Sequence, residues 1–521
     1  MSIDKYRSHD SRKGLTRSAG IIGLATFLSR ILGFIRDIII ARLFGVYVYS
    51  QAFVIAFKIP NLFRDLVGEG ATNAAIVPVL GEYLAQDRKK EFWEAANVLM
   101  NLLLVVLAGI TVLGVIFSPV LIRLIAPGFT ADPEKFAATV TLNRLIFPYI
   151  LLIGLTAYAM GILNSLRHFT IPAFAPCLLN ISIIVFALIW GEGIRGLASG
   201  VLVGGALQLA VQIPLLHRKG FRFSLNGNFR HPAIRKIGKL MTPRLLSSAI
   251  YQLNNFVDSI FGSLAFIVGE GGVAALYFSY RLIQFPLGIF GNSLSQALLP
   301  ALSCQAAQND YVKLKDTLLF GLRGVFFVMI PASVAFMVLS RPMVSALFGG
   351  GRFNAYSAQI TSGALFFYSI GLFAYGATKI LQCGYFALKD TVTPTKVSAI
   401  SLVLNCALNA ALMFSLKLNG LALATSISGI SGFLILLVIL RKKLGGLGLR
   451  GLIDFCVRVF LASVVMGEVC FIISGYPLGS GVPLLARAVN LLLPIAGGML
   501  AYFAMCALLK VNYLQGILWK R

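Results

Sequence analysis

Residues 95–120 read AANVLMNLLLVVLAGITVLGVIFSPV, a run without any charged side chain. A helix needs about 20 mostly apolar residues to cross the hydrocarbon core of a bilayer, so this run is long enough to span it. The whole chain of 521 residues has the same character, since 58% of it is hydrophobic and only 12% is charged. Soluble proteins carry roughly a quarter charged residues. The sequence therefore predicts an all-α integral membrane protein.

Other segments meet the same criterion of length and apolar composition. Together they predict about fourteen transmembrane helices, near 19–44, 51–81, 95–120, 137–163, 172–191, 194–216, 236–265, 272–304, 317–340, 357–385, 393–416, 419–440, 452–474 and 484–509. The second and eighth segments are long enough to be tilted or broken. The first follows a basic stretch but has internal arginines and no small-residue cleavage site, so we expect a retained helix rather than a signal peptide.

The basic residues indicate which way the chain is threaded. Lys and Arg number 45 against 19 Asp and Glu, and the net charge is +26. With the N-terminus inside, the even-numbered loops and both termini hold roughly 27 Lys and Arg, and the odd-numbered loops roughly 7. Both termini are therefore expected in the cytoplasm. The same charges also attract anionic lipid headgroups.

A weak internal repeat relates the two halves of the chain. The matching pairs are IVPVL at 76–80 with LLPAL at 298–302, Pro119 with Pro342, ILNS at 162–165 with ILQC at 380–383, and Pro172 with Pro394. The offset of roughly 220 residues corresponds to six helices, and an even number gives a parallel repeat with its pseudo-two-fold axis along the membrane normal. Two such lobes enclose a central cavity, and rocking one against the other gives alternating access.

This repeat sets the expected domain organisation. We expect a cytoplasmic N-terminal segment at 1–18, an N-lobe at 19–216, a basic cytoplasmic connector at 217–235, a C-lobe at 236–440, and two extra C-terminal helices with a tail at 441–521.

Charged residues at membrane depth are the candidate functional residues, because each needs a partner or a water-filled cavity. The first helix contains SRILGFIRD from Ser29 to Asp37. Its Arg30 and Arg36 lie about 9 Å apart along the axis and within about 120° in azimuth, which is compatible with one broad polar face. Lys58, Arg64, Asp65 and Glu69 in the second helix and Arg281 in the eighth complete the set.

The bases of this set outnumber its acids, which indicates an anionic guest. Most of the cations are arginines, whose planar fork holds phosphate in bidentate geometry. The alternative is that some arginines pair with acids or reach from helix ends to the interface, and we favour that interpretation for Arg42, Arg144 and Arg323. From the residues alone, the chain is a two-lobed carrier with a cationic cavity, and its substrate stays open.

Several of these segments resemble the MurJ (MviN) family of lipid II flippases. The similar stretches are Ser29 to Asp37, Ala52 to Arg64 with Gly68-Glu69-Gly70, Ala173 to Pro176 with Asn180, Gln252 to Asp258, Tyr277 to Leu282 with Phe285 to Gly288, and Leu388 to Thr391 with Thr393-Pro394. The resemblance covers nearly the whole chain. It implies the fold of the multidrug/oligosaccharidyl-lipid/polysaccharide (MOP, MATE-like) exporter superfamily, with fourteen helices and a groove beside the last two for the undecaprenyl tail.

The resemblance also implies roles for particular residues. Arg30, Arg36, Arg64 and Arg281 would be the cavity arginines that bind the diphosphate, with Ser29, Asp37, Lys58 and Glu69 as accessory cavity residues. The chain departs from acids common in the family at Gln51, Tyr280 and Gln284. These departures leave acid-based gating without support and make the cavity more positive.

The implied activity is translocation of lipid II from the cytoplasmic to the outer leaflet of the bacterial inner membrane. No catalytic residue and no cofactor is expected. Some relatives use sodium as a coupling ion, and Asp258 with Asp390 is the candidate sodium site, against helix packing for Asp258 and a helix cap for Asp390. Cell-wall synthesis proteins are plausible partners, and nucleic acid is not expected.

Other functions remain open from the residues. A flippase for another undecaprenyl-diphosphate oligosaccharide, of the O-antigen type, would recognise the same diphosphate. A drug exporter would need a net acidic cavity. A membrane enzyme acting on polyprenyl diphosphate would need paired acids for a metal or a general base, and neither a DDxxD-like cluster nor HExxH occurs. A scaffold or signalling protein would need a larger extramembrane domain.

Overall fold

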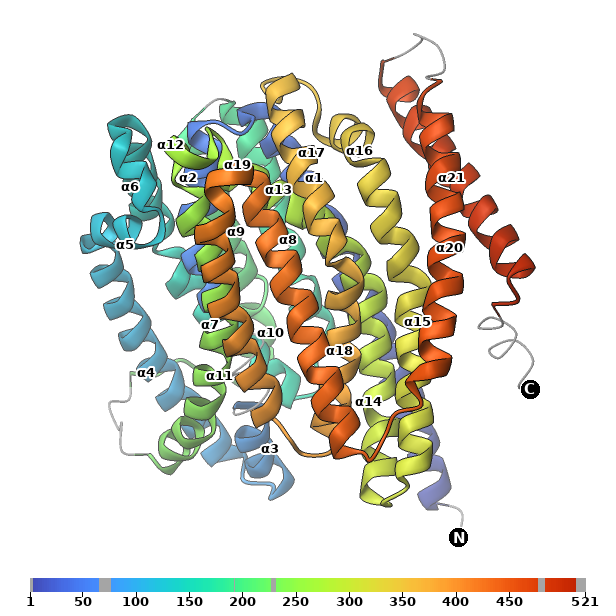
Figure 1. The fold of residues 1–521 in the computed structure, drawn as a ribbon. Coiled ribbons are helices and arrows are strands. Elements are labelled where there is room, and N and C mark those ends of the chain that lie inside the picture. The colour runs from blue at the N-terminus through green and yellow to red at the C-terminus, as the bar shows by residue number, and fades with distance from the viewer. Residues whose placement is uncertain (1–2, 65–75, 192, 226–230, 477–482, 512–521) are drawn as a thin grey trace. The chain divides into compact units, whose positions relative to one another are not determined.

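The computed structural model describes residues 3–64, 76–191, 193–225, 231–476 and 483–511, and it describes side chains from residue 20 onward except at 240, 242–255 and 483–485. All regular elements in these ranges are helices, and an isolated bridge between Gly350 and Phe353 is the one β contact among them (Figure 1). The all-α prediction is confirmed. The chain divides into two compact units, Met1–Phe256 and Val257–Arg521, while the expected lobe boundaries stay a prediction.

The N-terminal unit is built from eleven labelled α-helices and one 3₁₀ turn in its described residues. They are α1 (Ile3–Phe44), α2 (Val48–Phe63), α3 (Val77–Ala85), α4 (Lys89–Ile116), α5 (Ser118–Ile125), η2 (Pro127–Ala131), α6 (Pro133–Ile146), α7 (Tyr149–Ser165), α8 (Thr170–Trp190), α9 (Ile194–Ala210), α10 (Ile213–Arg218) and α11 (Pro232–Gly262), the last of which runs into the second unit. The helix expected near 95–120 is present as α4, a candidate membrane span, but it ends at Ile116, because the chain turns at Phe117 before Pro119 and continues as α5. The helix expected at 137–163 lies within one candidate span, Pro133–Ser165, in which a turn at Phe147 and Pro148 separates α6 from α7.

Small residues let the helices of this unit approach closely. Helix α9 packs along α8, and α8 packs along α1. A Cβ added at Gly200 would lie 2.7 Å from Ile183 Cα, and one at Gly204 would lie 2.9 Å from Leu179 Cα. Because those neighbours are backbone atoms that cannot move aside, glycine is needed for this contact.

The C-terminal unit repeats the order of long helix, short helix and bent pair. Its helices are α12 (Ala265–Val268), α13 (Gly272–Pro286), the π-helical turn η3 (Leu287–Gly291), α14 (Asn292–Ala307), α15 (Tyr311–Val338), α16 (Ser340–Phe348), α17 (Ala355–Ile370), α18 (Leu372–Ala387), α19 (Val392–Lys443), α20 (Leu449–Ser474) and α21 (Pro483–Leu508). The eighth expected segment is one continuous span, Gly272–Ala307, in which η3 is a π-helical turn between α13 and α14. The helix expected at 357–385 is present as a bent pair, because Gly371 divides it into α17 and α18 with an angle of 44° between them.

Helix α19 is the longest element and consists of two arms. Its backbone leaves the helical region at Lys417, where φ is 50° and ψ is −130°. The expected break between the segments 393–416 and 419–440 therefore lies where the sequence predicts it. A straight helix of 52 residues, at about 1.5 Å per residue, would be about 78 Å long. This length far exceeds the hydrocarbon core of a bilayer, which is about 30 Å thick.

The last two helices pack on each other and on α15. Helix α20 contacts both α15 and α21, as Figure 1 shows for the red pair beside α15. The Tyr502 hydroxyl on α21 donates a hydrogen bond to the Phe327 carbonyl oxygen at 2.7 Å. Burial of Val459, Met466 and Cys470 on α20 adds an apolar core to this contact.

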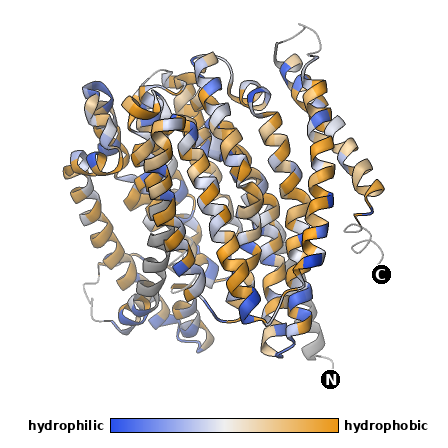
Figure 2. Ribbon diagram, in the orientation of Figure 1, coloured by the Kyte–Doolittle hydropathy of each residue, from blue (hydrophilic) through white to orange (hydrophobic). Residues whose placement is uncertain are grey.

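Nine helices in the described residues are long and apolar enough to cross a membrane, and ten if the bent pair α17–α18 counts as one span. Hydrophobic residues dominate the middle of the long helices, and hydrophilic residues gather toward their ends (Figure 2). The chain is thus a multi-span membrane protein. The number fourteen is finer than this count and stays a prediction.

Candidate polar sites in the two units

Arg36 on α1 is the best-defined of the expected site residues. Its guanidinium donates to Asp37 Oδ1 from Nε at 3.0 Å and from Nη2 at 2.7 Å, and to Asn180 Oδ1 from Nη1 at 3.2 Å. Arg36 is 6% exposed and Asp37 is fully buried. A buried cation needs this pairing, since an uncompensated charge in a low-dielectric interior is costly.

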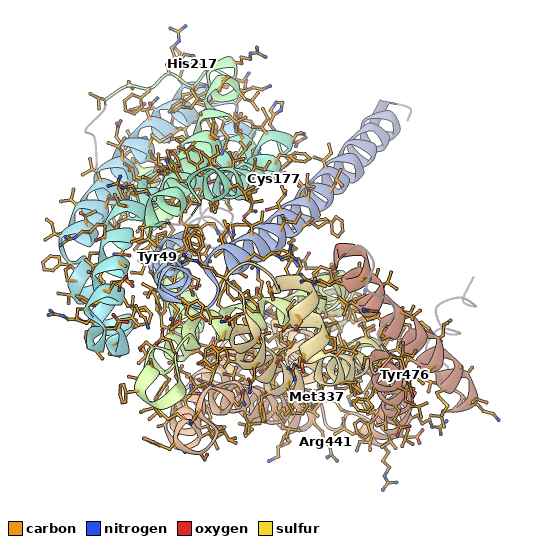
Figure 3. The ribbon with its side chains drawn as sticks, turned by 90° about the horizontal axis from the view of Figure 1, so that it is seen from above. Tyr49, Cys177, His217, Met337, Arg441 and Tyr476 are labelled. Atoms are coloured by element: carbon orange, nitrogen blue, oxygen red, sulfur yellow. The ribbon has the colours of Figure 1, made fainter. Side chains whose placement is uncertain are left out.

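The same pair fixes helix α1 against helix α8. Asn180 Nδ2 donates to the Ser29 carbonyl oxygen at 3.1 Å, so one α8 side chain holds α1 at two points about two turns apart. One turn earlier on α8, the Cys177 Sγ lies 3.9 Å from the Ala25 carbonyl oxygen of α1, and Figure 3 shows Cys177 beside that helix. The ring of Phe57 lies under the guanidinium, 5.8 Å from Arg36 Cζ. Arg36 is therefore an anchored residue in this structure.

The other expected residues of the N-terminal unit have more open surroundings. Arg30 is exposed on α1, and Ser29 beside it is partly buried. Lys58 on α2 lies over the ring of Phe256, with Nζ 5.5 Å from the ring centroid. Arg64 is partly buried and caps α2, where its backbone N–H bonds the Pro60 and Asn61 carbonyl oxygens. Asp65 and Glu69 lie outside the described residues.

Arg281 is the expected site residue of the C-terminal unit. It lies on α13, is partly exposed, and donates from Nη1 to Gln284 Oε1 at 3.4 Å. Tyr280 beside it packs on Tyr368, with ring centroids 5.5 Å apart. A neutral amide thus stands next to this guanidinium where the resemblance would place an acid in some relatives.

A second polar cluster of the C-terminal unit surrounds Asp258. Its carboxylate accepts hydrogen bonds from Asn409 Nδ2 and from Thr425 Oγ1, both at 3.4 Å. Asn405 bonds to both donors at 3.1 Å: its Oδ1 accepts from Asn409 Nδ2, and its Nδ2 donates to Thr425 Oγ1. Asn405 and Asn409 are buried, and Asn409 Oδ1 has no hydrogen-bond donor in the described structure. A carboxylate, two amide oxygens and a hydroxyl are the hard oxygen ligands that small alkali and alkaline-earth cations prefer.

Sequence reasoning found Asp258 and missed its neighbours. Asn405 and Asn409 are four residues apart on the first arm of α19, so they share a helix face, and that spacing was the available signal. Thr425 comes from the second arm, beyond the break at Lys417, and no local pattern connects it with the others.

Asp390 lies in a different environment from Asp258. Its carboxylate caps α19, accepting from Thr393 N at 2.9 Å and Thr393 Oγ1 at 2.7 Å, and it also accepts from Lys443 Nζ at 2.8 Å. Burial raises the pKa of this carboxyl, but the hydrogen bonds from Lys443 and Thr393 outweigh it and hold the pKa well below its ordinary value. The contacts are those of a helix N-cap with an ion pair, the alternative that the sequence left open.

Comparison with known proteins places this chain in a family. The sequence model of the family described as "Lipid II flippase MurJ" matches residues 40–487. A probable lipid II flippase MurJ of Buchnera aphidicola (subspecies Acyrthosiphon pisum) is 35% identical over 87% of this chain and 89% of its own length. A probable MurJ of Rickettsia prowazekii is 34% identical over 96% of this chain and 99% of its own.

Solved structures agree with these sequence matches. A lipid II flippase MurJ in an inward closed conformation superposes with a TM-score of 0.78 at 25% identity, over 95% of this chain and 99% of its own. A multidrug MATE transporter of the MOP superfamily in an inward-facing conformation gives 0.69 at 17% identity, over 80% and 94%, which is a likeness of fold alone. The chain belongs to the lipid II flippase MurJ family, and it is a multi-span membrane transporter rather than an enzyme.

Proposed function

We propose that this chain carries lipid II from the cytoplasmic to the outer leaflet of the bacterial cytoplasmic membrane by alternating access through a cationic central cavity. The observation that carries the proposal is the family match over residues 40–487. The headgroup cannot cross hydrocarbon unaided, because its diphosphate, sugars and peptide would lose water without replacement.

The architecture we propose has fourteen crossings in two six-helix lobes, followed by α20 and α21. The order α4, α5, α6–α7 and α8 recurs as α15, α16, α17–α18 and α19, with an offset of roughly 220 residues. The two arms of α19 count as two crossings because of the break at Lys417. Both termini are cytoplasmic in this arrangement, in agreement with the excess of Lys and Arg in the even-numbered loops.

The diphosphate site we propose consists of Arg30, Arg36, Arg64 and Arg281, with Ser29, Asp37, Lys58 and Glu69 as accessory residues. The contacts suggest a division of labour among the arginines. Since Asp37 already neutralises Arg36, Arg36 mainly positions α1. Arg30, about one and two-thirds turns earlier on the same helix, is the better phosphate ligand. Arg281 is partly exposed and its neighbour Gln284 is neutral, which supports contact with an anion at this position.

The driving force we propose is the membrane potential. Moving one negative charge outward is favoured by about 2.3 kcal/mol per 100 mV of inside-negative potential. Sodium is a candidate coupling ion at Asp258, supported by the amide and hydroxyl oxygens of Asn405, Asn409 and Thr425 around it. Asp390 is a poorer sodium ligand, because Lys443 and Thr393 already occupy its carboxylate.

The test is complementation of a bacterial strain depleted of its own flippase. Arg30→Ala and Arg281→Ala, expressed at the level of the parent, should fail to support growth, whereas Arg195→Ala, an exposed arginine at the start of α9, should support it. Growth of both site variants at the parental rate would contradict the cavity assignment. A leaflet-accessibility assay for lipid II after acute inactivation should then show the precursor retained in the inner leaflet and chemically unchanged.

A further inference from the structure

A cavity of about 340 Å³ opens in the C-terminal unit between α16, the turn after it, and the first turns of α17 and α21. Ser345, Gly350, Asn354, Arg487 and Asn490 contribute to its lining. This volume lies at the small end of the range for ligand sites and accommodates a phosphate with a small polar substituent. None of the lining residues is an acid.

Arg487 supplies the charge of this cavity. Its Nη1 donates to the Gly349 carbonyl oxygen at 2.9 Å, which fixes the guanidinium over the turn. Within the described part of the chain, no carboxylate lies within ion-pair distance of it. A guanidinium has five N–H donors in a planar fork that suits phosphate, so the group fixed here has further donors to offer an anion.

Glycines keep the cavity open beside that guanidinium. A Cβ at Gly349 would lie 2.2 Å from the Ser345 carbonyl oxygen, so only glycine fits there. Gly350 has a φ of +123°, which side chains rarely adopt, and a Cβ there would lie 3.7 Å from Arg487 Nη1. A larger residue at position 350 would therefore occupy the space next to the guanidinium.

At the corresponding place in the N-terminal unit, the start of α6, a lysine and an aspartate offset each other's charge. There, Asp132 caps α6 by accepting from Lys135 N at 3.1 Å, just as Asn354 caps α17 by accepting from Ser357 N at 3.0 Å. The buried Lys135 Nζ lies 3.8 Å from Asp132 Oδ2, so cation and anion offset each other. In the cavity of the C-terminal unit, the capping residue Asn354 is uncharged. The cation there is Arg487 of α21, a helix outside the repeat.

We propose that this cavity binds the phosphate of an anionic glycerophospholipid in the outer leaflet. Arg487 is the fifth residue of the apolar helix α21 (Pro483–Leu508), so it lies where that helix enters the membrane, near the depth of lipid phosphates. The outer face follows from the topology proposed above. Loops on that face carry few Lys and Arg, so a cation held in a cavity there is not explained by the threading of the chain.

The experiment is native mass spectrometry of the full chain in detergent, titrated with phosphatidylglycerol. Arg487→Gln should weaken lipid binding by about twofold to fivefold, the range for loss of an exposed charge pair. Arg195→Gln, which removes an exposed arginine from the first turn of α9, is the matched control and should bind like the parent. Equal affinity of Arg487→Gln and the parent, or an equal loss in both variants, would overturn the proposal.

A second variant and two further ligands complete the test. Ala346→Leu fills the cavity and leaves Arg487 in place, so it should also weaken binding by several-fold even if Arg487→Gln does not fold. Phosphatidylcholine, whose phosphate is offset by choline, should bind more weakly than phosphatidylglycerol. Glycerol 3-phosphate without acyl chains should not compete. Competition by glycerol 3-phosphate at the lipid's own concentration would identify a soluble phosphate as the ligand and refute the assignment to lipid. Because no flipping is measured, this outcome is independent of the proposed transport.

Discussion

Replacing Asn180 by leucine should release helix α1 from helix α8. Leucine has the same branched arrangement of side-chain heavy atoms but offers neither the acceptor for Arg36 Nη1 nor the donor for the Ser29 carbonyl oxygen. Side-chain hydrogen bonds in membrane proteins are worth about 0.6 kcal/mol on average and about 1.7 at most, and bonds to charged groups lie at the upper end. Loss of both should cost about 1–3 kcal/mol, which raises the open population of this contact about fivefold to 150-fold.

Cys177 is a built-in reporter for that opening. It is buried, and its Sγ faces the Ala25 carbonyl oxygen across the α1–α8 contact. Maleimide labelling of the folded protein, read at Cys177 by peptide mass spectrometry, should accelerate in Asn180→Leu by the factor above, because labelling follows the open population when opening is rapid. Asn101→Leu is the control, since it removes a buried bond to the Ser224 carbonyl oxygen elsewhere in the same unit. Unchanged labelling in Asn180→Leu, or an equal rise in Asn101→Leu, would refute the role assigned to Asn180.

Three further predictions concern charges of the C-terminal unit. Asp390→Asn keeps a capping side chain but loses the charge, so it should cost under about 1 kcal/mol at neutral pH, because Lys443 is 44% exposed. The pKa of Asp390 is lower in the folded chain than the ordinary carboxyl pKa. The stabilisation from its charge is therefore complete above the ordinary pKa and declines as the pH falls toward the folded pKa. In acid unfolding, the difference in stability between Asp390→Asn and the parent should shrink below about pH 4. Sodium should raise the Tm of the parent more than that of Asp258→Asn, and an equal rise with sodium in both would argue against a sodium site there. Gln284→Glu places a carboxylate beside Arg281 and should weaken binding of a soluble diphosphate analogue by about twofold to fivefold, and unchanged affinity would show that Arg281 does not contact the anion.

The sequence predicts most of the helices of this chain because the apolar runs are long and the bilayer sets their length. Where single helices were expected but broken ones occur, the break lies at proline or glycine, as at Phe117–Pro119 before α5 and at Gly371 between α17 and α18. Pro119 and Pro342 served only as markers of the repeat. In the structure each lies at the start of a short helix, α5 or α16, which hydropathy alone does not detect.

The polar contacts were less accessible from sequence. Arg36 and Asp37 are adjacent, and adjacent helix residues do not normally face each other. The structure shows that the long arginine side chain bends back to reach its neighbour, with Asn180 completing the contact. Uncharged residues such as Asn180, Asn405 and Thr425 carry no charge signal, and their importance depends on which helix packs against them. Contacts of this kind depend on tertiary packing, which periodicity does not specify.

Two arginines with the same expected role therefore differ in what they can do for an anion. Arg36 is buried, its charge is offset by Asp37, and a phosphate would have to displace a bond of 2.7 Å to reach it. Arg281 is partly exposed, and its neighbour Gln284 offers only an amide oxygen at 3.4 Å, which an anion displaces at little cost. Asp37 already offsets the desolvation of Arg36, whereas Arg281 is open to solvent on part of its surface. Phosphate binding should therefore depend on the charge of Arg281 and on the geometry of Arg36. Lysine at position 281 should then retain more function than lysine at position 36, where the fork itself holds two partners.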